Sequence, residues 1–264
     1  MVKFKFLFIV IVLVGCTKAP ITNRYQMITM ESQEEIALGE KYSKVLLKRA
    51  KISDNKKFKE MVHRVGMKIA NVVNQEYNRT HYKWAFHIVE NQKKSNAFCL
   101  SGGKVFIYTA LFQYIESDDE LAIVMGHEIA HALARHSAEK KTSSSLAKFG
   151  NTLLNFLDKT GEYKNPSIPL ERKWKQKMNQ EAIEKWIMLP HSRTQEYEAD
   201  RIGLVLSSKA GFNPKASLSF WKKFAKEHKD KPEYLSTHPS SAHRVDKLKE
   251  IMPDMMVYYR QSSK

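Results

Sequence analysis

The 264-residue sequence predicts a helix-rich α+β protein with one small three-stranded sheet. Apolar residues recur every three or four positions over residues 58–73 and 121–133, which is the period of one buried helical face. Between these segments, apolar and polar residues alternate over residues 84–88, which is the period of a strand. A hydrophobic content of 42% is ordinary for a chain with a packed core, so we expect a globular domain.

Two helices are expected to open the domain. Ser32 and Glu35 have the spacing of a capping box, and apolar residues continue from Ile36 to Leu46 at helical intervals. The segment 58–73 then forms a second helix, antiparallel to the first.

Three short strands are expected next. The first covers residues 84–88, and the segments "NAFCL" and "KVFIYT" lie on either side of Ser101, Gly102 and Gly103. Glycines between two apolar segments are typical of a hairpin turn.

The central helix is expected to start after Ser117, which with Glu120 forms another capping-box pattern followed by an acidic first turn. Its apolar residues continue to about Arg135 without a proline. Helical patterns return over about 195–210, from Pro214 with Asn213 as its N-cap, and over about 241–251.

Residues 137–192 are less regular and are interpreted as an insertion within the domain. They combine a Ser and Lys tract, a loop around "NPSIP" and an amphipathic run over 174–189. A lid over a cleft and a docking arm are both open as roles for this segment.

The N-terminus has the features of a secretion signal. Lys3 and Lys5 precede an apolar run, and the run is too short to span a membrane comfortably. The residues "LVGC" resemble the lipobox of bacterial lipoproteins, which implies removal of residues 1–15 and a lipid on Cys16. The alternative is an uncleaved anchor with an incidental cysteine. In the first case residues 16–264 form a single domain, and Thr17 after the cysteine resembles lipoproteins sorted to the outer membrane.

Charge and cysteine content narrow the function classes. The formal net charge is +16, and loss of residues 1–15 would leave +14. The basic residues are scattered, and no zinc knuckle or aromatic RNA-binding signature is present, so we expect no nucleic-acid partner. After Cys16 only Cys99 remains, which excludes an intramolecular disulfide in the mature chain. Cys99 is interpreted as a small buried apolar residue rather than a redox thiol.

The segment "MGHEIAHALARH", residues 125–136, carries the strongest functional signal. His127 and His131 are four residues apart on the expected helix, so both imidazoles project from one face and reach one ion. Glu128 lies about 100° around the helix, which suits a general base that accepts a proton from a zinc-bound water. The alternative is an amphipathic helix with a chance match. His136 is expected at the surface or beside the ligands.

A catalytic zinc needs a third protein ligand and an open fourth position. The best candidate is in "SRTQEYEADRIG", residues 192–203, where Glu196 and Asp200 share one helical face and Glu198 points elsewhere. Glu196 completes a His, His, Glu ligand set, and Asp200 can accept the outer N–H of a ligand histidine. Taken alone, this acidic pair is more typical of a solvated helix face; together with the histidine motif, it favours a metal site.

Four segments, "NAFCLSGGKVFIYTALF", "HEIAH", "SRTQEYEADRIG" and "THPSSAHR", resemble the motifs of the zinc metallopeptidases that include HtpX and the CAAX prenyl proteases. The nearest resemblance is to the periplasmic BepA- and LoiP-like proteases, and it covers roughly residues 25–252. It implies a gluzincin-like zincin fold with the HExxH motif on the active-site helix.

The resemblance also implies residue roles. It assigns one Zn²⁺ per chain to His127, His131 and Glu196, and it assigns the general base to Glu128. Asn96 and Ala97 match the edge strand that pairs with an extended substrate. Relatives often carry alanine and proline where this chain has Cys99 and Ser101, which leaves substrate preference at these positions open.

His238 and Arg244 match the late "HP" segment of the same family. In BepA-like members the histidine can take the fourth zinc position and hold the enzyme latent, and the arginine lies near the active site. The alternative for His238 is a loop or helix-cap residue.

The function expected from these features is a zinc-dependent endopeptidase of misfolded or stalled envelope proteins. It would be anchored by a lipid in the bacterial cell envelope, with the outer membrane favoured, and it would face the periplasm. The outer-membrane assembly machinery is then a candidate partner. One alternative is a zinc-stabilised assembly factor or holdase, which would not require Glu128. Another is zinc-dependent hydrolysis of a non-peptide amide, which leaves the edge-strand segment unexplained.

Overall fold

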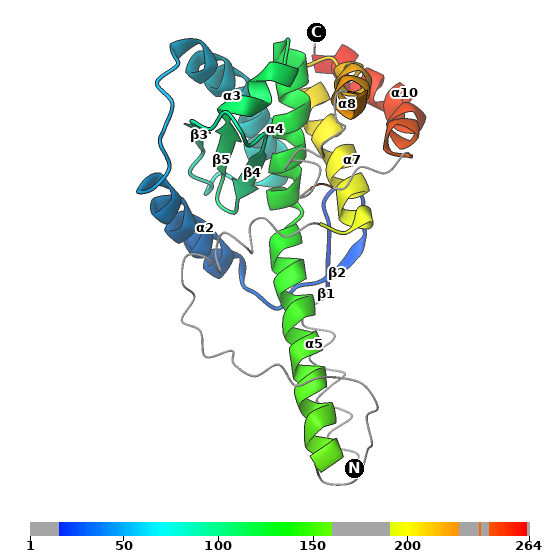
Figure 1. The fold of residues 1–264 in the computed structure, drawn as a ribbon. Coiled ribbons are helices and arrows are strands. Elements are labelled where there is room, and N and C mark those ends of the chain that lie inside the picture. Colours follow the sequence, from blue (N-terminus) through cyan, green and yellow to red (C-terminus); the bar gives the residue numbers. More distant parts are fainter. Residues whose placement is uncertain (1–15, 160–190, 227–237, 239–242, 263–264) are drawn as a thin grey trace.

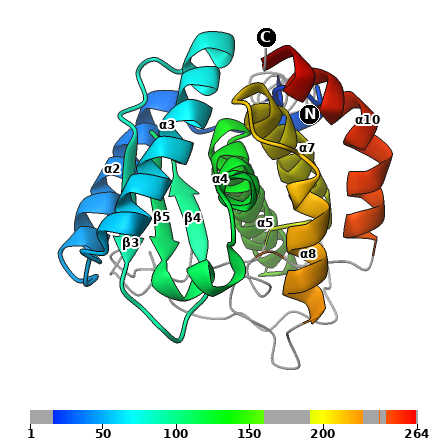
Figure 2. The same ribbon diagram turned by 90° about the horizontal axis from the view of Figure 1, so that it is seen from above.

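The computed structural model describes residues 16–159, 191–226, 238 and 243–262. Helix α4 (Asp118–Leu133) runs through the middle of the domain (Figure 1). Seen from above, the sheet lies on one side of α4 with helices α2 and α3, and helices α7, α8 and α10 lie on the other side (Figure 2). The bounds of the flanking helices are α2 Ser32–Leu47, α3 Lys56–Tyr77, α7 Arg193–Lys209, α8 Ala216–Lys226 and α10 Arg244–Ser262. The expected helix-rich α+β class is confirmed.

The sheet contains the three expected strands, β3 (Ala85–Val89), β4 (Ala97–Leu100) and β5 (Lys104–Tyr108), followed by the 3₁₀ helix η1 (Thr109–Tyr114). The strand order is β3-β5-β4, with β5 antiparallel to β4 and parallel to β3. Gly102 and Gly103 both have φ of +84°, a conformation that favours glycine, and they form the turn between β4 and β5. The order leaves β4 at an edge of this sheet.

Helix α3 packs one apolar face into the core. Val62, Val65, Ile69 and Val73 recur at three and four residues, and each is at most 1% exposed. Helix α4 is buried on all sides from Glu120 to Leu133, because it lies between the sheet and the second group of helices. The segment with His127, Glu128 and His131 is therefore on a helix that is buried on all sides.

The two expected capping boxes turn out differently. The Ser117 side chain caps α4 by accepting a hydrogen bond from the Glu120 backbone N–H at 3.2 Å. The Glu120 carboxylate, however, accepts from the Glu116 N–H at 2.8 Å, so the pair is not reciprocal. The capping box expected at Ser32 is wrong, because the N-cap of α2 is Glu31, which makes no side-chain capping bond.

The helices near the C-terminus differ from expectation at their ends. Asn213 accepts a hydrogen bond from the Lys215 N–H at 3.0 Å, but α8 begins only at Ala216. Helix α10 begins at Arg244 rather than near 241 and continues beyond 251, with Pro253 inside it. Sequence patterns located both helices and missed their starts by two or three residues, whereas the expected end of α10 at 251 falls 11 residues short of Ser262.

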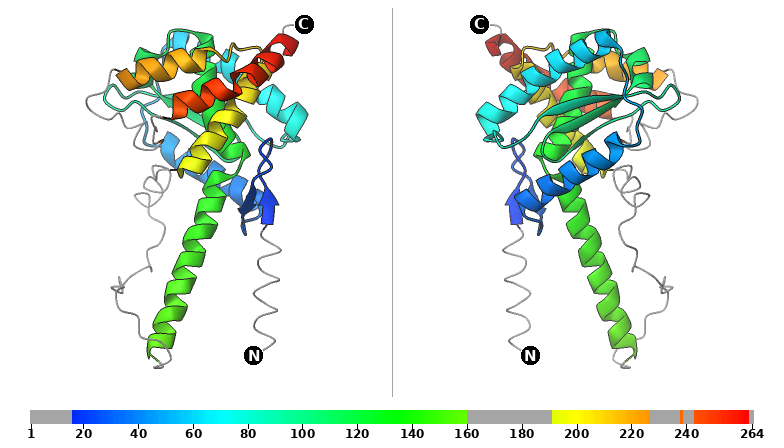
Figure 3. Two further views of the ribbon diagram at one scale, coloured as in Figure 1. Left: turned by 90° about the vertical axis from the view of Figure 1, so that its right-hand side faces the viewer. Right: turned by 90° about the vertical axis from the view of Figure 1, so that its left-hand side faces the viewer.

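The expected insertion is partly helical. Helix α5 (His136–Lys159) projects away from the body of the domain (Figures 1 and 3). The amphipathic run at 174–189 lies outside the described residues. Among the described residues, no helix has both the length and the apolar character required to cross a membrane.

An additional two-stranded sheet, which the sequence patterns did not indicate, lies near the N-terminus. Strands β1 (Cys16–Lys18) and β2 (Tyr25–Met27) pair antiparallel and lie beside the start of α5 (Figure 3). We call residues 16–27 the N-terminal hairpin. Cys16 is exposed at its start, and the expected signal at 1–15 lies outside the described residues.

Candidate metal centre

A pair of glycines brings helices α4 and α7 into backbone contact. A Cβ atom on Gly126 would lie 2.7 Å from the carbonyl oxygen of Gly203. A Cβ atom on Gly203 would lie 2.7 Å from the backbone nitrogen of His127. Both distances are shorter than van der Waals contact, so only glycine fits at this crossing. The close approach places Glu196, two turns before Gly203, over the histidines of α4.

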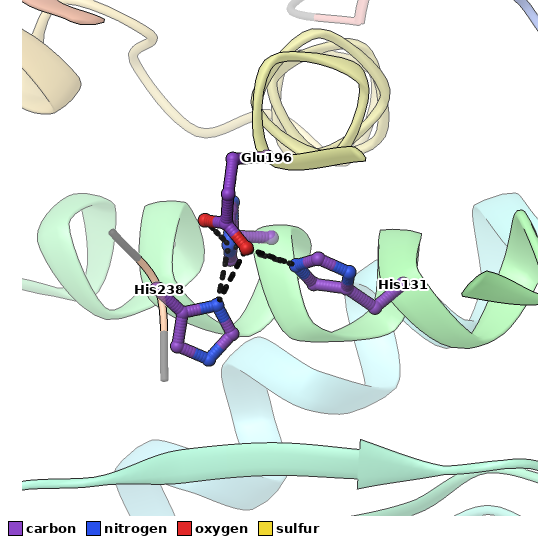
Figure 4. A group of neighbouring side chains, drawn as sticks. His131, Glu196 and His238 are labelled. Atoms are coloured by element: carbon purple, nitrogen blue, oxygen red, sulfur yellow. Dashed lines mark hydrogen bonds and ion pairs between the residues drawn. The ribbon is translucent and has the colours of Figure 1, made fainter. Parts of the chain in front are cut away.

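Four side chains converge at this crossing. The Nε2 atoms of His127 and His131 are 3.1 Å apart. Glu196 on α7 places its Oε2 atom 3.4 Å from His127 Nε2 and its Oε1 atom 3.5 Å from His131 Nε2. His238 lies on the other side of Glu196, with its Nδ1 atom 3.2 Å from Oε1 (Figure 4). The four residues can offer one ligand atom each, all within 4.8 Å of one another.

The protonation states of His131 and Glu196 suit a divalent metal ion. Burial and the neighbouring histidines hold the pKa of His131 well below its usual value, so its imidazole is neutral and has a free lone pair. Burial opposes ionisation of Glu196, but His238 and His127 outweigh it and hold its pKa well below the usual range. Glu196 Oε2 is buried and accepts no hydrogen bond among the described residues. A metal ion would satisfy this oxygen, and the two-histidine, one-carboxylate donor set suits zinc.

His127 is held from behind by an ion pair. Its Nδ1 atom lies 3.0 Å from Asp200 Oδ1, and Arg244 binds the same carboxylate through Nε at 2.5 Å and Nη2 at 2.6 Å. Burial opposes the charge of Asp200, but Arg244 and His127 lower its pKa. Burial also opposes protonation of His127, yet its hydrogen bond to Asp200 and the nearby carboxylate of Glu196 raise its pKa to about 9. Asp200 therefore lies where sequence analysis placed it, on the outer nitrogen of a candidate ligand.

Arg244 lies at the base of the site. It is 2% exposed, and its guanidinium carbon lies 3.7 Å from the ring centroid of Trp221. Its Nη1 atom is 3.4 Å from Glu196 Oε2. Arg244 thus contacts the carboxylates of both Asp200 and Glu196 from a buried position.

A cleft passes in front of the ligand atoms. One side, which we call the helix wall, consists of Glu128 and His131 on α4, Ser137 and Ala138 on α5, with His191 and His238. The other side, which we call the strand wall, consists of residues 96–101 with Met30 and, from α2, Glu35, Leu38, Gly39 and Tyr42. The structure therefore brings Asn96 and Ala97 into the same cleft as Glu128.

Glu128 and His238 meet inside this cleft. Glu128 is 2% exposed, and its Oε1 atom lies 3.5 Å from His238 Nε2. His238 is 3% exposed and has its other nitrogen, Nδ1, 3.3 Å from His127 Nε2. His238 is thus positioned between the candidate ligands and the candidate base.

His136 and His191 lie beside the candidate ligand His131. Of the two positions expected for His136, the structure has the one beside the ligands: His136 is fully buried, with its Nδ1 atom 2.8 Å from His131 Nδ1. The cause is Arg135, whose φ of +58° ends α4 and redirects the chain into α5. Sequence analysis missed His191, whose ring stacks on that of His131 with centroids 4.0 Å apart. The spacing of five residues from His131 to His136 would indicate contact between the two rings only if the helix break at Arg135 were recognised in the sequence.

Glu198 points away from the ligand atoms, as expected, but it has a partner of its own. Its Oε2 atom lies 3.0 Å from His136 Nε2. Burial raises the pKa of Glu198, while hydrogen bonds from His136, Arg24 and Thr22 outweigh this and bring it to about 2. Nothing in the local spacing of Glu198 indicates these partners, because two of them lie more than 170 residues away.

Comparison with known proteins agrees with this geometry. The sequence model of peptidase family M48 matches residues 56–252. The mitochondrial metalloendopeptidase OMA1 of Saccharomyces cerevisiae is 29% identical over 261 residues, covering 93% of this chain and 71% of the yeast protein. The OMA1 metalloendopeptidase of Bos taurus is 37% identical over 179 residues, covering 66% of this chain and 33% of the bovine protein.

A bacterial relative is similar over most of the chain. The beta-barrel assembly-enhancing protease of Escherichia coli K12 is 27% identical over 246 residues, covering 89% of this chain and 47% of that protein. The chain thus spans a third to about half of the length of the bovine and bacterial relatives. The family model covers well over half of the chain and includes every candidate ligand. The chain therefore belongs to peptidase family M48, a family of zinc metallopeptidases, and its enzyme class is metalloendopeptidase.

Proposed function

We propose that the protein is a zinc-dependent endopeptidase that holds one Zn²⁺ through His127, His131 and Glu196. The observation that carries this proposal is the convergence of their ligand atoms, 3.1 to 3.5 Å apart, directly beside Glu128 in a cleft. Zinc at such a site polarises a carbonyl and lowers the pKa of a water molecule to near 7. A purely structural site would need no carboxylate such as Glu128 in the open cleft.

Each residue of the site then has a defined task. Glu128 accepts the proton of the attacking water and passes it to the leaving amine, as general acid–base catalysis requires. Asp200 fixes the orientation of His127 by accepting its Nδ1 hydrogen, and Arg244 holds Asp200. Asn96 directly precedes the edge strand β4, and Ala97 is its first residue. An extended peptide can therefore add to β4 by backbone hydrogen bonds.

His238 is proposed to gate the site. Its Nδ1 atom lies among the candidate ligand atoms, and its Nε2 atom faces Glu128. A histidine in that position would take the coordination site that catalysis needs to be open. Substrate cleavage would then require His238 to move away.

The natural substrates are proposed to be misfolded or stalled proteins of a bacterial cell envelope. Support comes from the likeness to the beta-barrel assembly-enhancing protease and from the "LVGC" sequence that ends at the exposed Cys16. A lipid on Cys16 would tether the enzyme to the outer membrane, facing the periplasm and within reach of the outer-membrane assembly machinery.

The first experiment measures casein cleavage and bound zinc on the same purified samples. We expect the parent to bind one zinc per chain. Glu128→Gln should keep the zinc but cleave casein about 10²- to 10⁴-fold more slowly than the parent. Glu120→Gln is the matched control, because Glu120 is a buried glutamate of the same helix that pairs with Lys223 at 3.0 Å, away from the cleft. Full cleavage by Glu128→Gln would contradict the proposed mechanism.

The same assay tests the gate. His238→Ala should cleave casein faster than the parent while zinc remains bound through the other three ligands. A lower or unchanged rate would count against gating. Zinc binding without cleavage in both the parent and His238→Ala would favour the alternative, an assembly factor in which zinc serves the fold.

A further inference from the structure

A chain of buried hydrogen bonds begins on the side of His131 away from the ligand cluster. Nε2 of His131 faces His127 and Glu196, so only Nδ1 remains for another partner. That partner is Nδ1 of His136 at 2.8 Å, and the other nitrogen of His136 lies 3.0 Å from Glu198 Oε2. His136 and Glu198 are 0% and 5% exposed, so water does not compete for these bonds.

The chemistry of the three groups fixes the direction of the hydrogen bonds. If Nε2 of His131 gives its lone pair to a metal, its Nδ1 must carry the proton and donate it. His136 then accepts at Nδ1 and donates from Nε2, which is one of its two neutral tautomers. Glu198 is a carboxylate and accepts. The chain is therefore complete, with one hydrogen for each bond.

The far end of this chain is held by the N-terminal hairpin. Arg24 donates to Glu198 Oε2 from Nε at 2.8 Å, and Thr22 donates its hydroxyl to the other oxygen of the same carboxylate. Arg24 also pairs with Glu139 of α5 at 2.6 Å, and Gln195 of α7 donates to Glu139 at 2.8 Å. One arginine of the hairpin thus joins the two helices that follow the metal-binding motif.

These contacts lie partly outside the segment that the family model matches. That segment begins at residue 56, whereas Thr22 and Arg24 precede it. On the His127 side, by contrast, Asp200 and Arg244 are both inside it. The two candidate ligand histidines are therefore supported from different parts of the chain.

We propose that His136 and Glu198 are positioning residues for His131, and that Thr22 and Arg24 make the N-terminal hairpin a working part of the metal centre. The inference rests on the proposed zinc site. Outer partners of a ligand histidine fix its ring orientation and its tautomer, and their loss weakens metal binding about 10- to 100-fold. The hairpin starts at Cys16, so a lipid on that residue would be attached six residues before Thr22 and eight before Arg24.

A second metal ion is the rival reading of the same residues. His131, His136 and His191 can also offer three ligand atoms within 4.8 Å of one another. Because His131 uses Nε2 for the first ion, a second one would have to take the proton-bearing Nδ1. Bound there, an ion would replace the hydrogen bond between His131 and His136, so the two readings exclude each other.

The test measures zinc affinity by competition with a chromophoric chelator. His136→Ala and Glu198→Ala should bind zinc about 10- to 100-fold more weakly than the parent. His136→Asn should recover part of the loss, because its amide oxygen can accept the His131 Nδ1 hydrogen. Glu120→Ala is the matched control, since it also removes a buried, ion-paired carboxylate and should bind zinc as the parent does.

The hairpin is tested with a pair of arginine variants. Arg24→Ala should weaken zinc binding about tenfold. Arg64→Ala removes an arginine paired with Asp118 at 2.8 Å on α4, far along the helix from the histidines, and should leave zinc affinity unchanged. Arg24 is partly exposed, so its variant tests the inference even where replacement of the buried His136 prevents folding.

A spectroscopic measurement separates a positioning role from a general loss of stability. With Co²⁺ in place of zinc, His136→Ala and Arg24→Ala should change the visible absorption bands of the metal, whereas Glu120→Ala and Arg64→Ala should not. A loss of global stability alone would lower the melting temperature of all these variants without altering the bands of the folded, metal-saturated protein.

The outcomes also separate this inference from the proposed function. If the parent binds no zinc, or if His131→Ala binds zinc as the parent does, the zinc site itself is wrong. If His131→Ala loses zinc while His136→Ala, His136→Asn and Arg24→Ala match the parent, only the positioning role is overturned. Two ions per parent chain, one of which is lost in His191→Ala, would overturn it in favour of the second metal site.

Discussion

Behind the helix wall of the cleft, the candidate ligands are backed by buried, mutually paired charges, whereas the strand wall consists mainly of apolar side chains and backbone. Asp200 and Arg244 fix His127 through bonds of 2.5 to 3.0 Å. On the strand wall, Phe98 and Leu100 are 8% and 6% exposed and pack into a separate apolar cluster with Tyr42. The two walls would therefore serve different tasks. Fixed charges would hold the reacting groups in place, and the edge strand β4 of the apolar wall would pair with an extended substrate peptide.

The largest effect on stability and zinc binding is expected at the backbone contact between α4 and α7, which positions the candidate ligands behind the helix wall. Gly203→Val would push its side chain against the His127 nitrogen, which is only 2.7 Å from a Cβ at this position. Overpacking of this kind should lower the free energy of unfolding by about 3 kcal/mol and abolish zinc binding, because the crossing positions Glu196. Urea unfolding and zinc titration measure both effects. Parent-like zinc binding in this variant would show that the crossing does not position the ligands.

Asp200→Asn tests the charged support directly. The amide keeps the shape of the side chain but loses the charge that pairs with Arg244, and it leaves that buried guanidinium without its partner. Zinc affinity should fall about 10- to 100-fold, as measured by chelator competition. Lys223 pairs with Glu120 at the other end of α4, so Glu120→Gln is again the control. A change below twofold would mean that the ion pair does not orient His127.

The strand wall includes a buried ion pair between Glu35 and Arg135, and the loss of this pair should have a smaller effect. Glu35 of α2 accepts a hydrogen bond from the Ser101 hydroxyl at 2.7 Å and pairs with Arg135 at 2.7 Å. Glu35→Gln should lower the free energy of unfolding by about 1 to 3 kcal/mol, with zinc affinity unchanged. Glu40→Gln, on the more exposed side of the same helix, should cost less than about 1 kcal/mol. A large fall in the zinc affinity of Glu35→Gln would show that charges of the strand wall also support the metal site, contrary to the difference between the two walls.

The smallest effect concerns Cys99 in β4. Burial raises the pKa of the Cys99 thiol above its usual value, so the reactive thiolate is scarce at neutral pH. Alkylation by iodoacetamide at pH 8 should be slow at Cys99 and fast at the exposed Cys16, and the Cys99 rate should still be rising above pH 9. Mass spectrometry of the two peptides gives both rates. Equal rates would mean that the strand wall is open to solvent and less apolar than the helix wall.

The elements that the sequence predicts well are those whose cause is local. The period of α3, the cap at Ser117 and the glycine turn between β4 and β5 all depend on residues within a few positions of one another. Where a local signal competed with a distant one, the prediction failed. Ser32 and Glu35 have capping spacing, but the Glu35 carboxylate binds Ser101 and Arg135 instead.

By itself the sequence determined the pairing of His127 with His131, because four residues of helix place two side chains on one face. It likewise determined the neighbouring base candidate, Glu128, and the shared face of Glu196 and Asp200. Tertiary structure alone decided that α4 and α7 cross at Gly126 and Gly203, that Arg135 folds His136 back onto His131, and that Arg24 reaches Glu198. The physical reason is range: helix geometry relates residues a turn apart, whereas contacts between residues far apart in sequence depend on how the whole chain packs.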